Sequence, residues 1–322
     1  MAKLQKSLYN IHLTSMNKTL LLVHGRSWKP PESSLRNLWL DAIKWGLKRD
    51  VPEAADRFSE VKIEFVYYGD ISNSFLKKAL KKPYVDDTDS RRHTFGQLKG
   101  YSTNQFSKRN YNNLPGKESF KEGAADVLSP ILSFFNLSEA LIAKVAPDMR
   151  EYWNDESFYG TEVRRPMIKP LKRALDREGS TAIVAHSLGT MISYDTLWKF
   201  SRYGEWYDYW GKKVDLFVTL GSPLGDATVR EHIKGQKASR EREYPGNIRK
   251  WVNIAAEDDY ISHDSRISDD YKKMRQYGLV ESMKDYKIYN LSVREGKSNP
   301  HHSGGYLIHP KTIQVLADWI LA

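Results

Sequence analysis

The chain has 322 residues and no cysteine. The absence of cysteine excludes disulfide bonds, metal sites built on thiolates and a cysteine nucleophile, and it is compatible with a reducing compartment. We also expect no secretory signal, because residues 1–17 are polar and have no long apolar core. On these grounds we expect a cytoplasmic protein.

Long hydrophobic runs are absent as well. The most apolar long stretch, residues 127–147, is interrupted by Asn136, Glu139 and Lys144, so we expect no membrane-spanning helix. No linker rich in Gly and Ser or in Pro divides the chain, and there is no internal repeat. We therefore expect one domain over residues 1–322.

Acidic residues are fewer than basic ones. The chain has 50 Lys and Arg against 40 Asp and Glu, a net charge of +10. Such a surface attracts nucleic acid, anionic lipid or acidic substrates. The basic residues are spread along the chain and form no recognised nucleic-acid module. We expect no specific nucleic-acid partner, while an anionic membrane surface remains compatible with the charge.

Runs typical of strands alternate with runs typical of helices, which predicts a parallel sheet covered by helices. Residues 19–23 are apolar throughout, as expected for a strand buried on both faces. The fold class is therefore expected to be α/β, with a mostly parallel sheet of about six strands and helices on both faces. Ser33 or Ser34 is expected to cap the first helix. The other expected strands are 61–68, 181–184, 214–220, 249–255 and 286–293, and the expected helices are 35–47, 159–176, 190–200 and 310–321.

A serine lies between two small residues where an expected strand meets an expected helix. The segment Ala185-His186-Ser187-Leu188-Gly189 has the spacing that presents a nucleophile on a sharp turn, because the strand and helix pass close to it. The N–H of Leu188 would then point to a developing oxyanion. This five-residue motif taken alone also fits an ordinary turn between a strand and a helix that carries an unreactive serine.

Other polar groups follow the remaining expected strands. Ligands bind beyond the carboxyl ends of parallel strands, and a serine nucleophile needs a base and an acid that orients the base. The chain supplies candidates in the order serine, aspartate, histidine. The segments after the strands are His24-Gly25, Ser187, Gly221-Ser222-Pro223, Asp258-Asp259 and His301-His302.

In this order the motifs resemble the α/β-hydrolase superfamily, in particular its serine esterase and lipase branch. The resemblance covers most of the chain and leaves residues 71–155 outside it. It implies that Ser187 attacks a carbonyl and forms an acyl-enzyme, with a histidine as base and an aspartate orienting it. It also implies an oxyanion hole formed by the N–H of Leu188 and that of Arg26 or Gly25. No cofactor is implied.

The acid and the base each have two candidates. We favour Asp259 over Asp258, because Tyr260-Ile261 follows it and resembles the turn after the acid in the family. We favour His301 over His302, because its spacing to Tyr306 resembles the base loop. In each pair the other residue remains an alternative.

The remaining histidines have plainer interpretations. His24 and His186 flank the site and are candidate substrate contacts, but the favoured interpretation is that His24 packs beneath the oxyanion loop and that His186 shapes the turn. His263 and His309 are expected at the surface or in turns. Because the histidines are scattered without paired-ligand spacing, we expect no metal.

Arg26 stands where the family's oxyanion loop has a second glycine. Its side chain either pairs with an anionic group of the substrate or points to solvent.

Residues 71–155 are expected to form a cap or lid insertion, as is common in this superfamily. An apolar face toward the nucleophile would favour an acyl chain and, in a basic protein, an anionic lipid ester. Alternatively, the same residues simply dock the insertion onto the core. They are Leu128, Ile131, Leu132, Phe134, Phe135, Leu137, Leu141, Ile142 and Val145.

The sequence thus predicts a serine hydrolase acting on a carboxylic ester, with a small-molecule or lipid ester as its substrate. An amidase, peptidase or thioesterase would use the same three residues. A non-catalytic binding protein on a hydrolase scaffold is the alternative from another class.

Overall fold

The computed structural model of the protein describes residues 17–116, 147–262 and 264–322. Its central sheet has six parallel strands in the order β2-β1-β3-β4-β5-β6, which confirms the expected α/β class. Two short antiparallel strands, β7 (Val293–Arg294) and β8 (Lys297–Ser298), form a separate ladder. The six strands are β1 (Lys18–Val23), β2 (Lys62–Val66), β3 (Ser180–His186), β4 (Val214–Leu220), β5 (Ile248–Ala256) and β6 (Ser282–Ile288).

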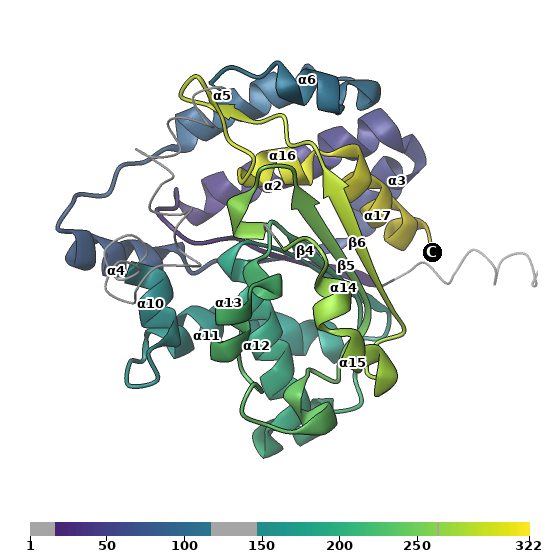
Figure 1. Ribbon diagram of the computed structural model, residues 1–322. Helices are drawn as coiled ribbons and strands as arrows, with labels where there is room; N and C mark the ends of the chain where they lie inside the picture. Colours follow the sequence, from purple (N-terminus) through teal and green to yellow (C-terminus); the bar gives the residue numbers. More distant parts are fainter. Residues whose placement is uncertain (1–16, 117–146, 263) are drawn as a thin grey trace, which may run out of the picture.

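Helices cover both faces of the sheet, as expected (Figure 1). The layer that includes the longest described helix consists of α2 (Glu32–Asp50), α3 (Pro52–Arg57), α5 (Thr88–Lys99), α6 (Lys108–Asn112), α16 (Ser303–Leu307) and α17 (Pro310–Leu321). The opposite layer consists of α4 (Gly69–Leu80), α10 (Pro147–Trp153), α11 (Tyr159–Leu175), α12 (Leu188–Arg202), α13 (Ala227–His232), α14 (Ile267–Asp270) and α15 (Lys272–Gln276).

The strand β1 shows why the sheet is apolar on both sides. Successive side chains of a strand point to opposite faces. Leu20 and Leu22 pack against the layer of α2, whereas Leu21 and Val23 pack against the layer of α12. All four are fully buried, so this part of the strand contributes to the cores on both faces of the sheet.

The strand order has a reversal point at β1. From β1 the chain first adds β2 on one side and later adds β3 on the other side of β1. The connections after β1 and β3 therefore leave the sheet toward different sides, and such a reversal point is where open α/β sheets bind ligands. The segments His24-Gly25 and Ser187 follow these two strands.

Two expected boundaries are wrong. The helix α2 begins at Glu32 with Pro31 at its N-cap, so Ser33 and Ser34 lie in its first turn and do not cap it. The last strand ends at Ile288, not at residue 293. The chain leaves the sheet there because the Asn290 side chain donates hydrogen bonds to the carbonyl oxygens of Pro300 and His302.

The described half of the expected insertion docks onto the core. Phe95 and Leu98 of α5 are buried among side chains of the layer that contains α2. The apolar residues expected to face the nucleophile, between 128 and 145, lie outside the described residues. Within the three described ranges, no helix has the length and apolar character needed to cross a membrane.

The central strand β3 offers a test of the core. Replacing the fully buried Ile183 by alanine removes three carbons from a packed site, so Ile183→Ala should lower the free energy of unfolding by about 2–5 kcal/mol. The control Val85→Ala, at a side chain that is 69% exposed, should change it by less than about 0.5 kcal/mol. Urea denaturation measures both, and equal effects would contradict the assigned core.

Candidate active site

Ser187 occupies a strained turn between β3 and α12. Its φ of 55° and ψ of −128° lie where a residue with a side chain costs about 1–3 kcal/mol. The N–H of Ser187 donates to the Leu220 carbonyl oxygen at 3.0 Å, which ties the turn to β4. A Cβ on Gly189 would come within 2.3 Å of the His24 carbonyl oxygen. The expected small residue is therefore required, because α12 starts against the end of β1.

Three side chains that are distant in the sequence meet at this turn. His301 Nε2 lies 2.9 Å from Ser187 Oγ, and His301 Nδ1 lies 2.9 and 3.0 Å from the two carboxylate oxygens of Asp259. With Nδ1–H donating to Asp259, Nε2 is left to accept the serine proton. Asp259 is buried, while the side chain of His301 remains 29% exposed. The exposed imidazole edge gives a substrate access to the pair.

The carboxylate of Asp259 is held by further donors. The N–H of Ile261 donates to its Oδ1 at 3.0 Å, and the hydroxyl of Tyr306 donates to its Oδ2 at 2.5 Å. The neighbouring Asp258 is oriented differently. Its backbone has a φ of 58°, and its carboxylate accepts a hydrogen bond from Tyr111 of α6. Of the two candidate acids, Asp259 is the one bonded to a histidine.

Of the two candidate bases, His301 is the one that contacts Ser187. The side chain of His302 instead caps α16, where its Nδ1 accepts the N–H of Gly304 at 3.2 Å. Its ring packs edge-on against Phe95. Burial lowers the pKa of His302 well below the usual value, so it stays neutral inside the protein.

His24 and His186 belong to the scaffold of the site. His24 Nδ1 donates to the Gly25 carbonyl oxygen, its Nε2 accepts the N–H of Tyr68, and its ring stacks on Tyr68. His186 Nε2 lies 2.9 Å from the carbonyl oxygen of His301, to which it donates. Both rings are buried. Their assignment as substrate contacts is therefore wrong for His24, whose ring nitrogens are both occupied, and unsupported for His186.

The loop after β1 passes directly against the nucleophile. A Cβ on Gly25 would lie 2.8 Å from Ser187 Cβ and 2.9 Å from His186 Nδ1, so only glycine fits there. The N–H of Leu188 is the first of α12 and has no acceptor within its own helix. The loop at Gly25 and the N–H of Leu188 thus both lie beside Ser187.

Arg26 takes neither of the two expected positions. Its guanidinium binds the carboxylate of Asp148 in α10, with Nε 3.1 Å from Oδ1. Asp148 is fully buried and also accepts the N–H of Ser27, whose φ is 75°. Because the Asp148 carboxylate neutralises the charge of Arg26, this side chain is not available to pair with an anionic group of a substrate. It also does not point to solvent, because it is bound to Asp148. Sequence reasoning missed this pair, since nothing links positions 26 and 148 in the sequence.

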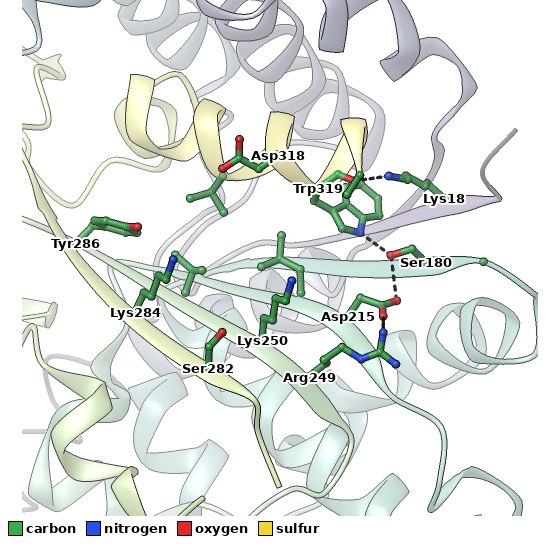
Figure 2. A pocket seen from close by; sticks show the side chains of 15 residues that line it. Lys18, Ser180, Asp215, Arg249, Lys250, Ser282, Lys284, Tyr286, Asp318 and Trp319 are labelled. Atoms are coloured by element: carbon green, nitrogen blue, oxygen red, sulfur yellow. Dashed lines mark hydrogen bonds and ion pairs between the residues drawn. The ribbon is translucent and has the colours of Figure 1, made fainter. Parts of the chain in front are cut away.

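A cavity of about 610 Å³ lies at the opposite, amino edge of the sheet (Figure 2). The ammonium groups of Lys250 and Lys284 point into it from neighbouring strands. The Ser180 hydroxyl, at the start of β3, donates to Asp215 at 3.0 Å and accepts from Trp319 at 2.8 Å. No histidine is among the lining residues. This cavity therefore lacks the pairing of a serine with a histidine that is found at Ser187.

Comparison with known proteins gives no relative: the chain matches no protein-family model, no curated protein and no solved structure. Across the part of the chain that the structure describes, no group of three or more His, Asp or Glu side chains is arranged to hold a metal ion. The assignment of a function therefore depends on the geometry around Ser187.

The buried histidines make a pH test possible. His263 lies outside the described residues, but His309, expected at the surface or in a turn, is buried at the N-cap of α17, and burial lowers its pKa to about 3. An unfolded histidine has a pKa of about 6.5. Between these values the unfolded chain binds the extra proton, so the free energy of unfolding should fall as the pH drops below about 6.5.

The variant His309→Asn isolates this effect, because an asparagine oxygen can still accept the N–H of Lys311 at the N-cap. Between pH 7 and 5 the variant should lose about 2 kcal/mol less unfolding free energy than the wild type. Urea denaturation at both pH values measures the difference. Parallel pH dependences would contradict a neutral, buried His309.

Proposed function

We propose that the protein is a serine hydrolase of the α/β-hydrolase type, which cleaves a carboxylic ester through an acyl-enzyme on Ser187. The observation that carries this proposal is the hydrogen-bonded series from Ser187 through His301 to Asp259. A hydroxyl is a weak nucleophile at neutral pH unless a positioned base takes its proton, and the series supplies that base and its orienting acid.

The reaction begins when Ser187 Oγ attacks the ester carbonyl carbon and His301 Nε2 takes the hydroxyl proton. The carbonyl oxygen becomes an oxyanion, which accepts hydrogen bonds from the N–H of Leu188 and from the loop at Gly25-Arg26. The intermediate collapses, the bond to the alcohol oxygen breaks, and His301 gives its proton to the departing alcohol. Water then attacks the acyl-enzyme with His301 again as base, and the carboxylic acid is released.

Asp259 acts through His301 in both half-reactions. It keeps the Nδ1–H tautomer, so that Nε2 faces Ser187 as an acceptor, and it stabilises the imidazolium formed when the proton is taken. Its carboxylate is buried among hydrogen-bond donors, which hold it in place against His301.

The order of the elements supports the finer fold assignment. Ser187 follows β3, Asp259 follows β5, and His301 follows β6 through the loop that Asn290 holds. In α/β-hydrolases the nucleophile turn is also the strand-to-helix turn, and an oxyanion donor comes from a loop after another strand. The loop at Gly25 takes that place here.

A carboxylic ester is the expected substrate class because an alkoxide leaves a tetrahedral intermediate more readily than an amide nitrogen does. The pairing of Arg26 with Asp148 removes the cation that would have selected an anionic ester at this loop. Nothing at Arg26 then favours a charged acyl or alcohol group over a neutral one.

Labelling with a fluorophosphonate tests the nucleophile. The wild type should be modified at Ser187, while Ser187→Ala should remain folded and unlabelled. His301→Ala should lower turnover by about 10⁴-fold or more, and His302→Ala, which removes the adjacent histidine, should retain turnover after correction for folded protein. A wild type that is never labelled, or His301→Ala with full activity, would contradict the proposal.

A panel of p-nitrophenyl esters of increasing acyl length, beside matched amides and thioesters, measures the bond type on the same preparations. Hydrolysis of esters with higher kcat/KM than of the amides and thioesters is expected. Preference for an amide or a thioester would keep the mechanism and overturn the substrate class. Absence of turnover and of labelling together would favour a binding protein.

The oxyanion loop can be tested through Gly25. A methyl group there would collide with Ser187 and His186, so Gly25→Ala should displace the loop and cost about 10²–10³-fold in kcat. The matched control is Gly96→Ala in α5, where a Cβ would meet no atom within 4 Å. Steady-state kinetics should separate the two, and similar losses in both would contradict the loop's role.

A further inference from the structure

We infer that Tyr306 is a positioning residue of the proposed active site, whose hydroxyl fixes the Asp259 carboxylate in the orientation that His301 requires. The inference rests on the proposed function and adds a fourth residue to it. The distance of 2.5 Å between Tyr306 Oη and Asp259 Oδ2 is the observation that carries it.

Hydrogen bonds on both its donor and its acceptor side hold the Tyr306 hydroxyl in this position. While it donates to Asp259, it accepts the N–H of Ala256 at 2.8 Å, and Ser262 Oγ lies 3.4 Å away. The ring is 0% exposed. Burial raises the pKa of Tyr306 well above its usual value, so the phenol keeps the proton that it donates to Asp259.

These contacts join the segments that carry the acid and the base. Ala256 is the last residue of β5, Asp259 lies in the turn after it, and Tyr306 lies in α16, which follows His301. A movement of the acid relative to the base would therefore stretch a hydrogen bond to Tyr306. The two segments are thereby held at one separation before a substrate binds, which is the preorganisation that such a site requires.

The donors also fix rotation of the carboxylate about its own bond. Oδ1 accepts from Ile261 and Oδ2 accepts from Tyr306, while His301 Nδ1 lies nearly equidistant from both oxygens. Without the phenol, Oδ2 would have one strong donor fewer in a buried place. Hydrogen bonds to charged groups are stronger than those between neutral groups. The loss of this bond should therefore change how the Asp259 carboxylate is oriented against His301 Nδ1.

Packing alone is the competing explanation. The ring of Tyr306 lies 5.7 Å from that of His186, and it would contact a Cβ placed on Gly221 at 3.1 Å. Tyr306→Phe keeps this ring and removes only the hydroxyl, so it separates packing from positioning.

The chain supplies a matched control in Tyr111. This tyrosine is 1% exposed, and its hydroxyl donates at 3.0 Å to the carboxylate of Asp258, directly beside Asp259. Tyr111→Phe thus removes a part-buried hydroxyl that contacts Asp258 and the Glu257 carbonyl oxygen in the same turn, but does not contact the carboxylate that is bonded to His301.

The experiment measures the rate of fluorophosphonate labelling from pH 5 to 9, together with the low-field proton NMR signal of the hydrogen bond between His301 and Asp259. In Tyr306→Phe the rate at neutral pH should fall by about 10-fold or more, and the acid limb of the profile should move, because the Asp259 carboxylate loses the donor that orients it against His301. The NMR signal should also move. In Tyr111→Phe the rate should stay within about threefold, with the limb and signal unmoved.

If Tyr306→Phe does not fold, 4-aminophenylalanine at position 306 keeps a neutral donor in the same ring, and it should label within about threefold of the wild type. A folded Tyr306→Phe whose profile and NMR signal match the wild type would overturn the inference, as would a slow amino variant. The NMR signal does not depend on turnover. A displaced signal in a protein that is never labelled would therefore keep the positioning role and refute the hydrolase.

Discussion

The hydrogen bond between His301 Nε2 and Ser187 Oγ joins residues 114 positions apart, and the surrounding architecture serves to make it. Parallel strands bring every connection that can carry chemistry to one edge of the sheet. The strained turn lifts the hydroxyl, and close contact with the loop after β1 leaves room only for glycine at positions 25 and 189. After β6, the Asn290 side chain donates hydrogen bonds to the carbonyl oxygens of Pro300 and His302, and these bonds hold the loop that carries His301.

Most of the charged and titratable groups around the hydrogen bond between His301 and Ser187 are paired or buried. The Asp148 carboxylate is paired with Arg26, and Asp259 is surrounded by donors. The neighbouring imidazoles of His24, His186 and His302 are kept neutral by burial, which lowers the pKa of each. Buried groups with fixed states reorganise little when charge develops nearby. In the proposed mechanism, the partly exposed His301 is the group that exchanges a proton.

Local patterns were enough to predict much of this. The small residues around Ser187 and the apolar strands have steric causes that act over a few positions, so the turn and the six-stranded α/β sheet followed from the sequence. The preference for Asp259 and His301 agrees with the hydrogen bonds. The pairing of Arg26 with Asp148 and the donor from Tyr306 did not follow, because they depend on how distant segments pack. The prediction that Ser33 or Ser34 caps the first helix was wrong, because α2 begins at Glu32 and its N-cap residue is Pro31.

The order of strands in the sheet also sets when the site can exist. β1 lies between β2 and β3, so one edge of β1 stays unpaired until β3, more than 150 residues later in the sequence, has been made. Such long-range pairing is slow compared with local contacts. During translation the serine emerges long before the imidazole that would activate it. An interrupted or nascent chain that stops before residue 301 would carry the Ser187 hydroxyl without the imidazole, so the proposed reactivity would appear only after the segment of His301 has joined the fold.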